Sequence, residues 1–470
     1  MTRPRAGSGL LLVATILGSG AVFLEGSVTA VALPAMAKDL GLGLAGLQWV
    51  MNGYLLTLSA LMLLGGSLGD RYSRRRVFGI GLAAFAVASL GCALAPSVEI
   101  LVCARLVQGA AGALVVPNSL ALLETTFHGE ERGAAIGKWS AWSAVSSALG
   151  PLIGGTLVDL TSWRVVFVAV APFALVAAWM ANRAGATGSR DAEPTRTAID
   201  YRGAVLATIG LAGIITAMIA APHSGYASGG VIAAFSIGIA ALIGFVIAEH
   251  RAKEPLLPPG IFKSRQFLGV NVTTLLVYAA LNGLFFLLML QLQTNVGYSA
   301  LTAGSCLLPI NALMLAVSPV AGRVAQRIGP RTPMVVGALI AAAGMLLFGR
   351  VRPGGTFVTT VLPATLVFGF GLACFVAPLT SVALDALGEK LAGLASGVNN
   401  AVARLAGLFA TAVIPVAAGL GGSASLKGAT LTTGFTHAMY ISAGLCVAGA
   451  VVAAVTIGGE TAASPRASGK

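Results

Sequence analysis

Charged side chains are scarce in this sequence of 470 residues: only 10% are Asp, Glu, Lys or Arg, while 57% are hydrophobic. So few charges cannot cover the surface of a water-soluble protein, which excludes both the soluble globular class and intrinsic disorder. Cysteine is also rare. The five cysteines lie in or beside long apolar runs, at Cys92, Cys103, Cys306, Cys374 and Cys446. We therefore expect reduced thiols that pack among apolar groups, and no disulfide scaffold.

Several chemical signatures are also missing from the sequence. It has no phosphate-binding Gly-Lys motif, no cluster of metal ligands and no nucleophile triad. ATP-driven transport and membrane-embedded enzymes therefore have no support, and we expect a protein that is not an enzyme and that needs no metal or other cofactor. Lys and Arg number 29 against 16 Asp and Glu, a net charge of +13. In such an apolar chain, an excess of positive charge is explained by Lys and Arg in the loops, which set the orientation of the membrane spans. We therefore expect no nucleic-acid partner.

Long apolar runs make up most of the chain. A helix needs about 20 apolar residues to cross a bilayer, and lipid offers no partner for the backbone of an open strand. A β-barrel would show alternation instead of solid blocks. The sequence therefore predicts an all-α polytopic membrane protein with 14 transmembrane helices, near 9–37, 45–69, 77–95, 98–121, 133–158, 164–181, 203–222, 229–248, 267–293, 301–322, 332–349, 356–379, 392–420 and 435–458.

The distribution of positive charge predicts the orientation of these spans. Lys and Arg accumulate on the cytoplasmic side of membrane proteins. Of the 29, 22 fall on the side of the N-terminus and five on the opposite side, while Arg105 and Arg404 lie inside spans. Both termini are therefore expected in the cytoplasm, with membrane lipids as partners. The first run, after Arg3 and Arg5, is too long for a signal peptide and is taken as span 1.

A weak internal repeat indicates two similar halves. The segment from Gly66 to Arg76 after span 2 has an echo from Gly322 to Arg331 after span 10. The two segments are too far apart for six spans alone, so two extra spans are expected between the halves. The predicted organisation is a six-helix half over 1–182, a cytoplasmic linker over 183–202, two additional helices over 203–250, a second linker over 251–266, a six-helix half over 267–459 and a cytoplasmic tail over 460–470.

Several motifs resemble those of one transporter family. They are Leu24 to Pro34 in span 1, Gly66 to Arg76 after span 2, Leu101 to Gly112 in span 4, Gly150 to Gly155 in span 5, Trp163-Arg164 with Phe167 and Pro172, and Ser396 to Asn400 with Arg404. In this order and on this topology, they are similar to the motifs of the major facilitator superfamily, specifically its fourteen-span drug:proton antiporter branch. Glu25 stands where that branch usually has Asp, and Ser146 replaces the leading glycine of its span 5 motif.

Glu25 is the only acid well inside an apolar span. An ionised carboxylate at that depth is costly, so it is a natural proton carrier. The helical rise places Glu25 and Arg105 about 12–14 Å below the outer surface, in one layer. The resemblance places Arg105 on the central cavity and gives the two residues a role in proton coupling. The alternatives are that Glu25 is a structural acid and that Arg105 only binds carbonyl groups of span 1.

The resemblance also implies gating residues. Asp70, Arg71 and Arg75 lie in the loop after span 2, where family analogy puts Asp70 against the cytoplasmic end of span 13. Gly150, Pro151 and Gly154 form the antiporter motif, which ties the protein to export. The alternatives are that the Arg cluster only enforces topology and that the glycines form a packing seam.

Polar and aromatic side chains on the spans are candidates for binding substrate. Those in span 9 recur at helical spacing on one face and mix amides with aromatic and flexible apolar groups, as suits a roomy cavity. Interhelical hydrogen bonding is the alternative for each. The candidates are Gln48, Trp49, Asn52, Asn271, Tyr278, Asn282, Phe285, Met289, Gln293, Asn399, Asn400 and Arg404.

Together these features predict a monomeric proton-coupled antiporter that exports small amphipathic drugs or toxic compounds by alternating access. The Ala- and Gly-rich composition, with Arg outnumbering Lys, points to the cytoplasmic membrane of a high-GC bacterium. One alternative is a dedicated exporter of a single metabolite, such as an antibiotic, amino acid or lipid-like product. A proton-linked importer or a membrane protein without transport is the other.

Overall fold

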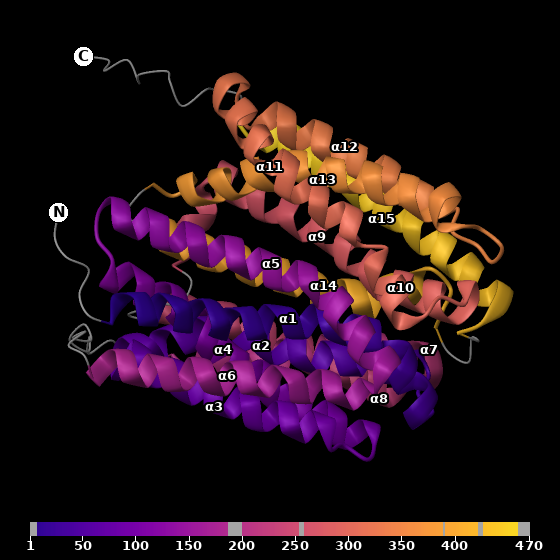
Figure 1. Cartoon of the computed structure of the whole chain (residues 1–470), viewed down its shortest axis with the longest axis horizontal. Coiled ribbons are helices and arrows are strands. Elements are labelled where there is room, and N and C mark those ends of the chain that lie inside the picture. The colour runs from indigo at the N-terminus through magenta and orange to yellow at the C-terminus, as the bar shows by residue number, and fades with distance from the viewer. Residues whose placement is uncertain (1–6, 187–199, 253–257, 389–390, 422–425, 459–470) are drawn as a thin grey trace. The chain divides into compact units, whose positions relative to one another are not determined.

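The computed structural model describes residues 7–186, 200–252, 258–388, 391–421 and 426–458, and its regular elements are helices (Figure 1). They are α1 (Ser8–Leu40), α2 (Leu44–Tyr72), α3 (Arg74–Ala93), α4 (Val98–Thr126), α5 (Glu130–Leu160), α6 (Trp163–Ala186), α7 (Tyr201–Ser224), α8 (Gly229–Arg251), η1 (Pro259–Lys263), α9 (Arg265–Leu290), η2 (Gln291–Val296), α10 (Ala300–Ser305), α11 (Leu308–Ile328), α12 (Arg331–Phe348), η3 (Phe357–Val361), α13 (Leu362–Asp385), α14 (Ala392–Ala417) and α15 (Gly428–Thr456).

Fourteen helical segments within the described residues are long and apolar enough to cross a membrane, which confirms the predicted number of spans. Three of these segments combine two elements: η2 extends α9, α10 leads into α11, and η3 leads into α13. Most of the predicted linker 183–202, the residues 253–257 of the second linker and the predicted tail 460–470 lie outside the described residues.

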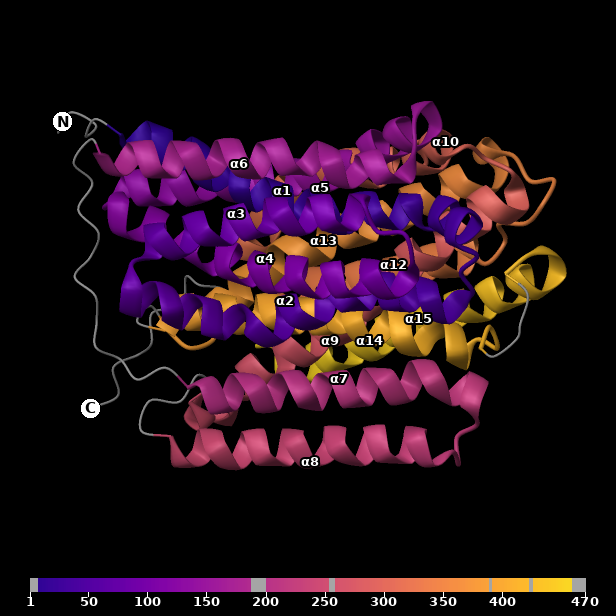
Figure 2. The same cartoon turned by 90° about the horizontal axis from the view of Figure 1, so that it is seen from below.

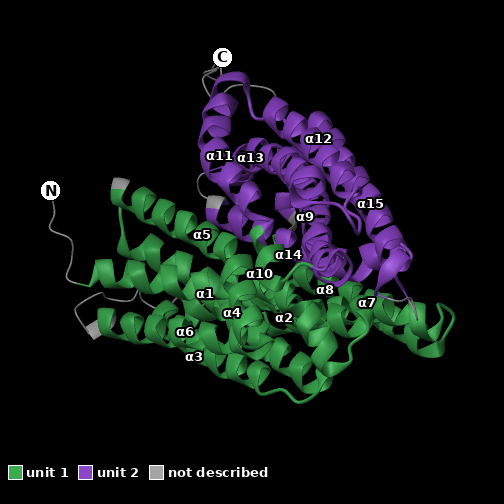
Figure 3. Cartoon of the chain, turned by 45° about the vertical axis from the view of Figure 1, so that its right-hand side comes forward, with its two compact units in different colours: residues 1–258, 298–305 green, residues 259–297, 306–470 purple. Residues whose placement is uncertain are grey.

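The first compact unit comprises Met1–Pro258 and Tyr298–Ser305 (Figure 3). In it α1 packs against α4, α5 and α6, while α2 and α3 both pack against α4. The additional helices α7 and α8 lie side by side (Figure 2), and α7 packs on α2. A Cβ atom added to Gly213 of α7 would come within 2.8 Å of Gly238 of α8. Missing side chains at these two positions therefore let the two backbones approach closely.

The second compact unit comprises Pro259–Gly297 and Cys306–Lys470. Here α9 packs against α14 and α15, and α13 packs against α11 and α12. The predicted span 10 is divided, because α10 belongs to the first unit and α11 to the second. The predicted boundaries of the halves remain a prediction; in the structure the two additional helices group with the first unit.

Large apolar side chains fill the interior of each unit. In the first, Phe78, Phe85 and Phe167 are fully buried, and in the second so are Phe267, Phe286, Phe348, Phe368, Phe375 and Phe435. The five cysteines are free thiols. The expectation that they all pack among buried groups is wrong for Cys103, which is exposed on α4.

Candidate functional site

An ion pair joins α1 to α4 inside the first unit. Arg105 Nη1 donates a hydrogen bond of 2.7 Å to Glu25 Oε1, and both side chains have 0% exposure. The two residues therefore lie in one layer of the helices, as the helical-rise argument predicts. Because neither charge can reach water, each depends on the other and on nearby hydrogen bonds for its stability.

Side chains of three helices surround the Arg105 guanidinium. Its Nε donates to the carbonyl oxygen of Val50 at 3.0 Å, and its Cζ lies 4.4 Å from the ring centroid of Tyr54, both on α2. The ring of Phe167 on α6 lies 5.7 Å away. The alternative from the sequence was that Arg105 only binds carbonyl groups of span 1. The structure shows a carbonyl contact of Arg105 with Val50 of α2.

A line of hydrogen bonds extends the pair across α4 to α3. Gln108 Oε1 accepts from Arg105 Nη1 at 2.7 Å, and Gln108 Nε2 donates to Ser89 Oγ at 2.8 Å. On α1, Thr29 Oγ1 donates to Glu25 Oε1 at 3.1 Å. The polar cluster is therefore larger than the two charged residues. Gln108 stands three residues after Arg105 and Thr29 four residues after Glu25, which is the spacing that could have identified them from the sequence.

One oxygen of the carboxylate is held more weakly than the other. Glu25 Oε1 accepts hydrogen bonds from Arg105 and Thr29, whereas Glu25 Oε2 and Arg105 Nη2 are buried and have no hydrogen-bond partner among the described residues. Oε2 can therefore take up a proton while Oε1 keeps both of its donors. Such an atom is what a reversible proton carrier inside a membrane requires.

The expected position of Arg105 on an open central cavity is not observed. Its side chain is enclosed by Tyr54, Phe167 and the Glu25 carboxylate. Cation–π contact with two rings and the charge-assisted hydrogen bonds hold it inside the first unit. In this conformation the pair is an internal element of the helix packing and has no surface on which a substrate could lie.

The loop after span 2 shows an ion pair that the sequence reasoning did not assign. Arg74 Nη2 lies 2.7 Å from Asp70 Oδ1, and Arg74 Nη1 donates to the carbonyl of Ala121 near the end of α4 at 3.2 Å. Asp70 thus holds α3 and α4 through Arg74. The gating roles predicted for Asp70, Arg71 and Arg75, including the contact with span 13, remain predictions.

The glycines of the span 5 motif make close backbone contacts. A Cβ atom added to Gly150 would lie 1.9 Å from Ser27 Oγ of α1, and one added to Gly154 would lie 3.2 Å from the Cα of Val28. On α10, a Cβ atom added to Gly304 would lie 2.2 Å from the carbonyl oxygen of Pro151. The packing alternative for this motif is therefore realised, because α5 touches α1 on one side and α10 on the other.

In the second unit, amide side chains join α9 to α14. Asn399 Nδ2 donates to Asn271 Oδ1 at 3.3 Å and to Thr274 Oγ1 at 2.8 Å. Asn271 is buried, and its own Nδ2 donates to the carbonyl of Phe267 at 2.8 Å. For Asn271 and Asn399 the alternative of interhelical hydrogen bonding is thus the observed one.

Further along the same two helices, three other candidates come together. Asn282 Nδ2 donates to the carbonyl of Tyr278 at 2.8 Å, and a Cβ atom added to Gly407 of α14 would lie 3.1 Å from Asn282 Oδ1. Tyr278, Asn282 and Arg404 are half-buried. They form a polar line along α9 and α14 that can exchange hydrogen bonds with a ligand.

The remaining substrate candidates differ in exposure. Met289, Gln48 and Asn52 are buried with exposures of 1%, 1% and 0%, and their contact with substrate remains a prediction. The half-buried or exposed candidates are Trp49, Phe285, Gln293 and Asn400. The sequence does not show the burial of Met289, Gln48 and Asn52, because helical spacing identifies a polar face but not whether that face meets a cavity or packs against a neighbouring helix.

Comparison with known proteins decides the family. A family model described as Major Facilitator Superfamily matches residues 15–411. The chain belongs to this superfamily. It is a multi-pass membrane transporter and not an enzyme.

Named relatives of this transporter are resistance proteins. It is 36% identical over 406 residues to a tetracenomycin C resistance and export protein of Streptomyces glaucescens, covering 86% of this chain and 75% of that one. It is 34% identical over 475 residues to a puromycin resistance protein of Streptomyces alboniger, covering 98% and 93%. A peptide transporter bound to sulfate has the same fold, with a TM-score of 0.68 at 15% identity and coverage of 96% and 94%. The transporter is thus homologous to bacterial drug and antibiotic resistance exporters.

Two features of this transporter were missed by sequence reasoning. Asp159 at the end of α5 accepts hydrogen bonds from the backbone amides of Ala300 at 3.0 Å and Leu301 at 2.8 Å, at the start of α10. Aspartate at a span end looks like an ordinary surface acid, so no signal marked it. On the same helix Trp142 is 56% exposed. An exposed tryptophan on a span that makes close contacts elsewhere is a candidate for binding aromatic or amphipathic molecules.

Proposed function

We propose that this transporter is a proton-driven antiporter that exports small amphipathic compounds of drug or antibiotic type across a bacterial cytoplasmic membrane. The observation that carries the proposal is the fully buried pair of Glu25 and Arg105, with Glu25 Oε2 open to a proton. Its homology to resistance exporters supports the substrate class. The charge count of the sequence supports cytoplasmic termini.

Protonation of Glu25 changes the contact between α1 and α4. The ionised carboxylate holds Arg105 at 2.7 Å, whereas the neutral acid offers it only an ordinary hydrogen bond. Leu24 and Ser27, which flank Glu25, lie against Gly150 of α5. A weaker attraction between Glu25 and Arg105 would therefore also change the close contact between α1 and α5, which lies within one helical turn of Glu25. In the proposed cycle, protonation favours release of the substrate and deprotonation restores the binding conformation.

The decisive experiment measures efflux in proteoliposomes with an imposed pH gradient. Glu25→Gln keeps the size of the side chain and an oxygen for Arg105 but cannot carry the proton, so the gradient is expected to lose its effect on efflux. Glu99→Gln is the matched control, because Glu99 is exposed on α4. Unchanged gradient-driven efflux by Glu25→Gln would show that the proton carrier lies elsewhere.

The charge of the preferred substrate follows from the same pair. Among the acids of the described spans, Glu25 has 0% exposure and faces Arg105, whereas Glu249, 4% exposed, lies near the end of α8. Uptake of one proton balances a monovalent cation or accompanies a neutral compound. We therefore expect dications to be transported poorly, and equal transport of a dication would contradict this reasoning.

A narrower function is the second candidate. Several relatives carry the name of one antibiotic, including methylenomycin A resistance proteins of Bacillus subtilis, 32% identical, and Streptomyces coelicolor, 33% identical. A dedicated exporter of one product would fit that pattern. A binding panel separates the two, because micromolar binding of several unrelated dyes fits only the broad exporter.

A further inference from the structure

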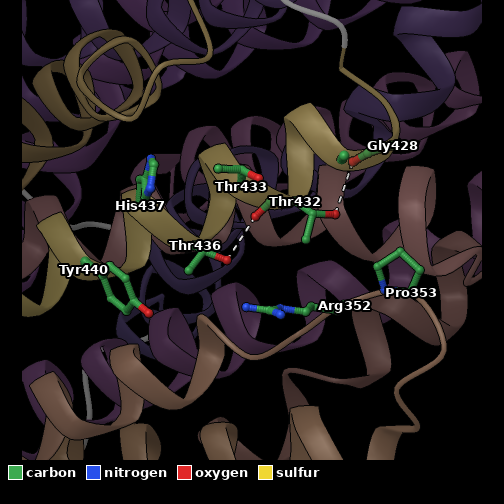
Figure 4. A pocket seen from close by; sticks show the side chains of 9 residues that line it. Arg352, Pro353, Gly428, Thr432, Thr433, Thr436, His437 and Tyr440 are labelled. Atoms are coloured by element: carbon green, nitrogen blue, oxygen red, sulfur yellow. Dashed lines mark hydrogen bonds between the residues drawn. The ribbon is translucent and has the colours of Figure 1, made fainter.

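A cavity of about 690 Å³ lies at one end of the second unit, away from the residues discussed above. It is lined by Arg352 and Pro353 from the loop after α12 and by the first turns of α15 (Figure 4). By the charge count this end of the helices faces the outside. The α15 residues that line the cavity are Gly428, Ala429, Thr432, Thr433, Thr436, His437 and Tyr440.

Two threonines hold the wall of the cavity in place. Thr436 Oγ1 donates to the carbonyl of Gly349 at 3.1 Å and so ties α15 to the end of α12. Thr432 Oγ1 accepts from Gln291 Nε2 at 3.3 Å and from Asn295 Nδ2 at 3.1 Å. The wall is therefore anchored to α12 and η2 by side-chain hydrogen bonds. These contacts keep the cavity a fixed feature of the unit.

Other donors in the cavity are not used by the protein. The side chains of Arg352, His437 and Tyr440 make no hydrogen bond or ion pair with any described residue. All three are exposed. In Figure 4 the Arg352 guanidinium extends along the cavity below Thr436 toward Tyr440. A guanidinium, a phenol and an imidazole are the groups that hydrogen-bond an anionic oxygen.

Basic side chains gather at this end of the second unit. Arg350, Arg352 and Lys427 are exposed there. All acidic residues of the sequence after Pro258 are Asp385, Glu389 and Glu460, which come at or after the opposite ends of α13 and α15. Water solvates these exposed cations, and with no carboxylate of their own unit near them among the described residues they give this end of the unit a positive potential that attracts anions.

The surface next to the cavity is apolar. On α12, Leu346 is 48% exposed, and on α15, Val447 and Val451 are 42% and 56% exposed. These residues come within two or three turns of the cavity along the two helices, which pack against each other. Tyr440, 55% exposed, stands between the polar and the apolar parts, where tyrosine is favoured at a membrane surface. A ligand that fits both parts has an anionic head and an apolar chain.

We propose that this cavity binds the phosphate headgroup of an anionic phospholipid from the adjacent leaflet. Arg352 pairs with the phosphate, Tyr440 donates a hydrogen bond to it, and the acyl chains lie along the exposed side chains of α12 and α15. Free phosphate offers the same head without the chains. The apolar surface beside the cavity favours the lipid.

Lipid binding to the purified full-length transporter tests the proposal independently of transport. Native mass spectrometry would compare phosphatidylglycerol with phosphatidylcholine of the same acyl chains, and would add excess inorganic phosphate as a competitor. We expect tighter binding of phosphatidylglycerol that inorganic phosphate does not displace. Equal binding of the two lipids, or displacement by inorganic phosphate, would overturn the assignment to an anionic lipid.

Single substitutions test whether phosphatidylglycerol binds in this cavity. Arg352→Gln is expected to weaken phosphatidylglycerol binding about five- to tenfold. Arg350→Gln is the matched control, because Arg350 is exposed two residues away and does not line the cavity. Tyr440→Phe removes only a hydroxyl, so the fold is kept, and binding is expected to fall about threefold. An equal effect of Arg350→Gln, or unchanged binding by Tyr440→Phe, would mean that the lipid is held by general surface charge and not by this cavity.

Discussion

Removing one partner of the buried ion pair should cost more stability than the pair contributes as a whole. Glu25→Leu leaves the Arg105 charge enclosed with 0% exposure, and Arg105→Met leaves the carboxylate in the same position. Glu25→Leu strands a guanidinium that stays charged, whereas the carboxyl group left by Arg105→Met can take up a proton and become neutral. The double variant strands none, because both positions then carry apolar groups of similar size.

The magnitude follows from the contacts. Stranding one charge of a buried pair costs about 3–5 kcal/mol in the free energy of unfolding. Arg105→Met also removes hydrogen bonds to Gln108 Oε1 at 2.7 Å and to the Val50 carbonyl at 3.0 Å. Even with Glu25 protonated, it should therefore cost about 1–3 kcal/mol. The double variant should be more stable than Glu25→Leu alone, with an interaction energy of about 3 kcal/mol between the two positions.

The assay is reversible unfolding in mixed detergent micelles, with tryptophan fluorescence as the signal. The exposed ion pair of Arg132 and Glu124, 3.4 Å apart with side-chain exposures of 49% and 30%, provides the matched control. Its cycle of single and double variants should give an interaction energy below about 1 kcal/mol. If the cycle on Glu25 and Arg105 gave no more than this control, the charges would not depend on each other, and the account of the buried pair would be refuted.

Three further predictions concern other parts of the transporter. Gly150→Ala places a Cβ atom 1.9 Å from a hydroxyl oxygen of α1, so the melting temperature should fall as expected for a loss of about 1–3 kcal/mol, whereas Gly137→Ala on the same helix meets nothing within 4 Å and should leave it unchanged or higher. Asp159→Asn removes the carboxylate that caps α10, so hydrogen exchange at the first two amides of α10 should be about tenfold faster. An unchanged rate would show that Asp159 does not protect these amides. Cysteine at exposed Ala227, between α7 and α8, should react with an impermeant maleimide in intact cells, whereas cysteine at exposed Ala134 should react only after lysis, and the reverse pattern would invert the proposed orientation.

The number and type of the helices could be predicted from the sequence because of one strong physical constraint. A span must be apolar over about 20 residues, so charged residues and turns mark its ends clearly. The breaks within spans were not visible in this way. The turn at Cys306 and Leu307 between α10 and α11 carries no charge, and Pro309 at the start of α11 is its one signal in the sequence.

The sequence identified the charged residues of the candidate site, but it predicted only some of the contacts that the candidate residues make. Glu25 and Arg105 stood out because a charge in an apolar span is costly, and both prove to be buried together. Gln48 and Asn52 were assigned to substrate but are buried. Position along a helix gives the depth of a residue and helical spacing gives the polar face, but neither shows whether that face meets a cavity or packs against a neighbouring helix.

The buried pair of Glu25 and Arg105 and the start of span 10 are connected by contacts within the first unit. Glu25 lies on α1 beside the close contact with Gly150, and the same helix α5 ends at Asp159, which caps α10. Two positions that act through one packed helix should not behave independently. We therefore expect the effects of Glu25→Gln and Asp159→Asn on gradient-driven efflux to be non-additive, the double variant being little worse than Glu25→Gln alone. Efflux losses that simply multiply would place Asp159 outside the proton-linked step and leave its cap a matter of local stability.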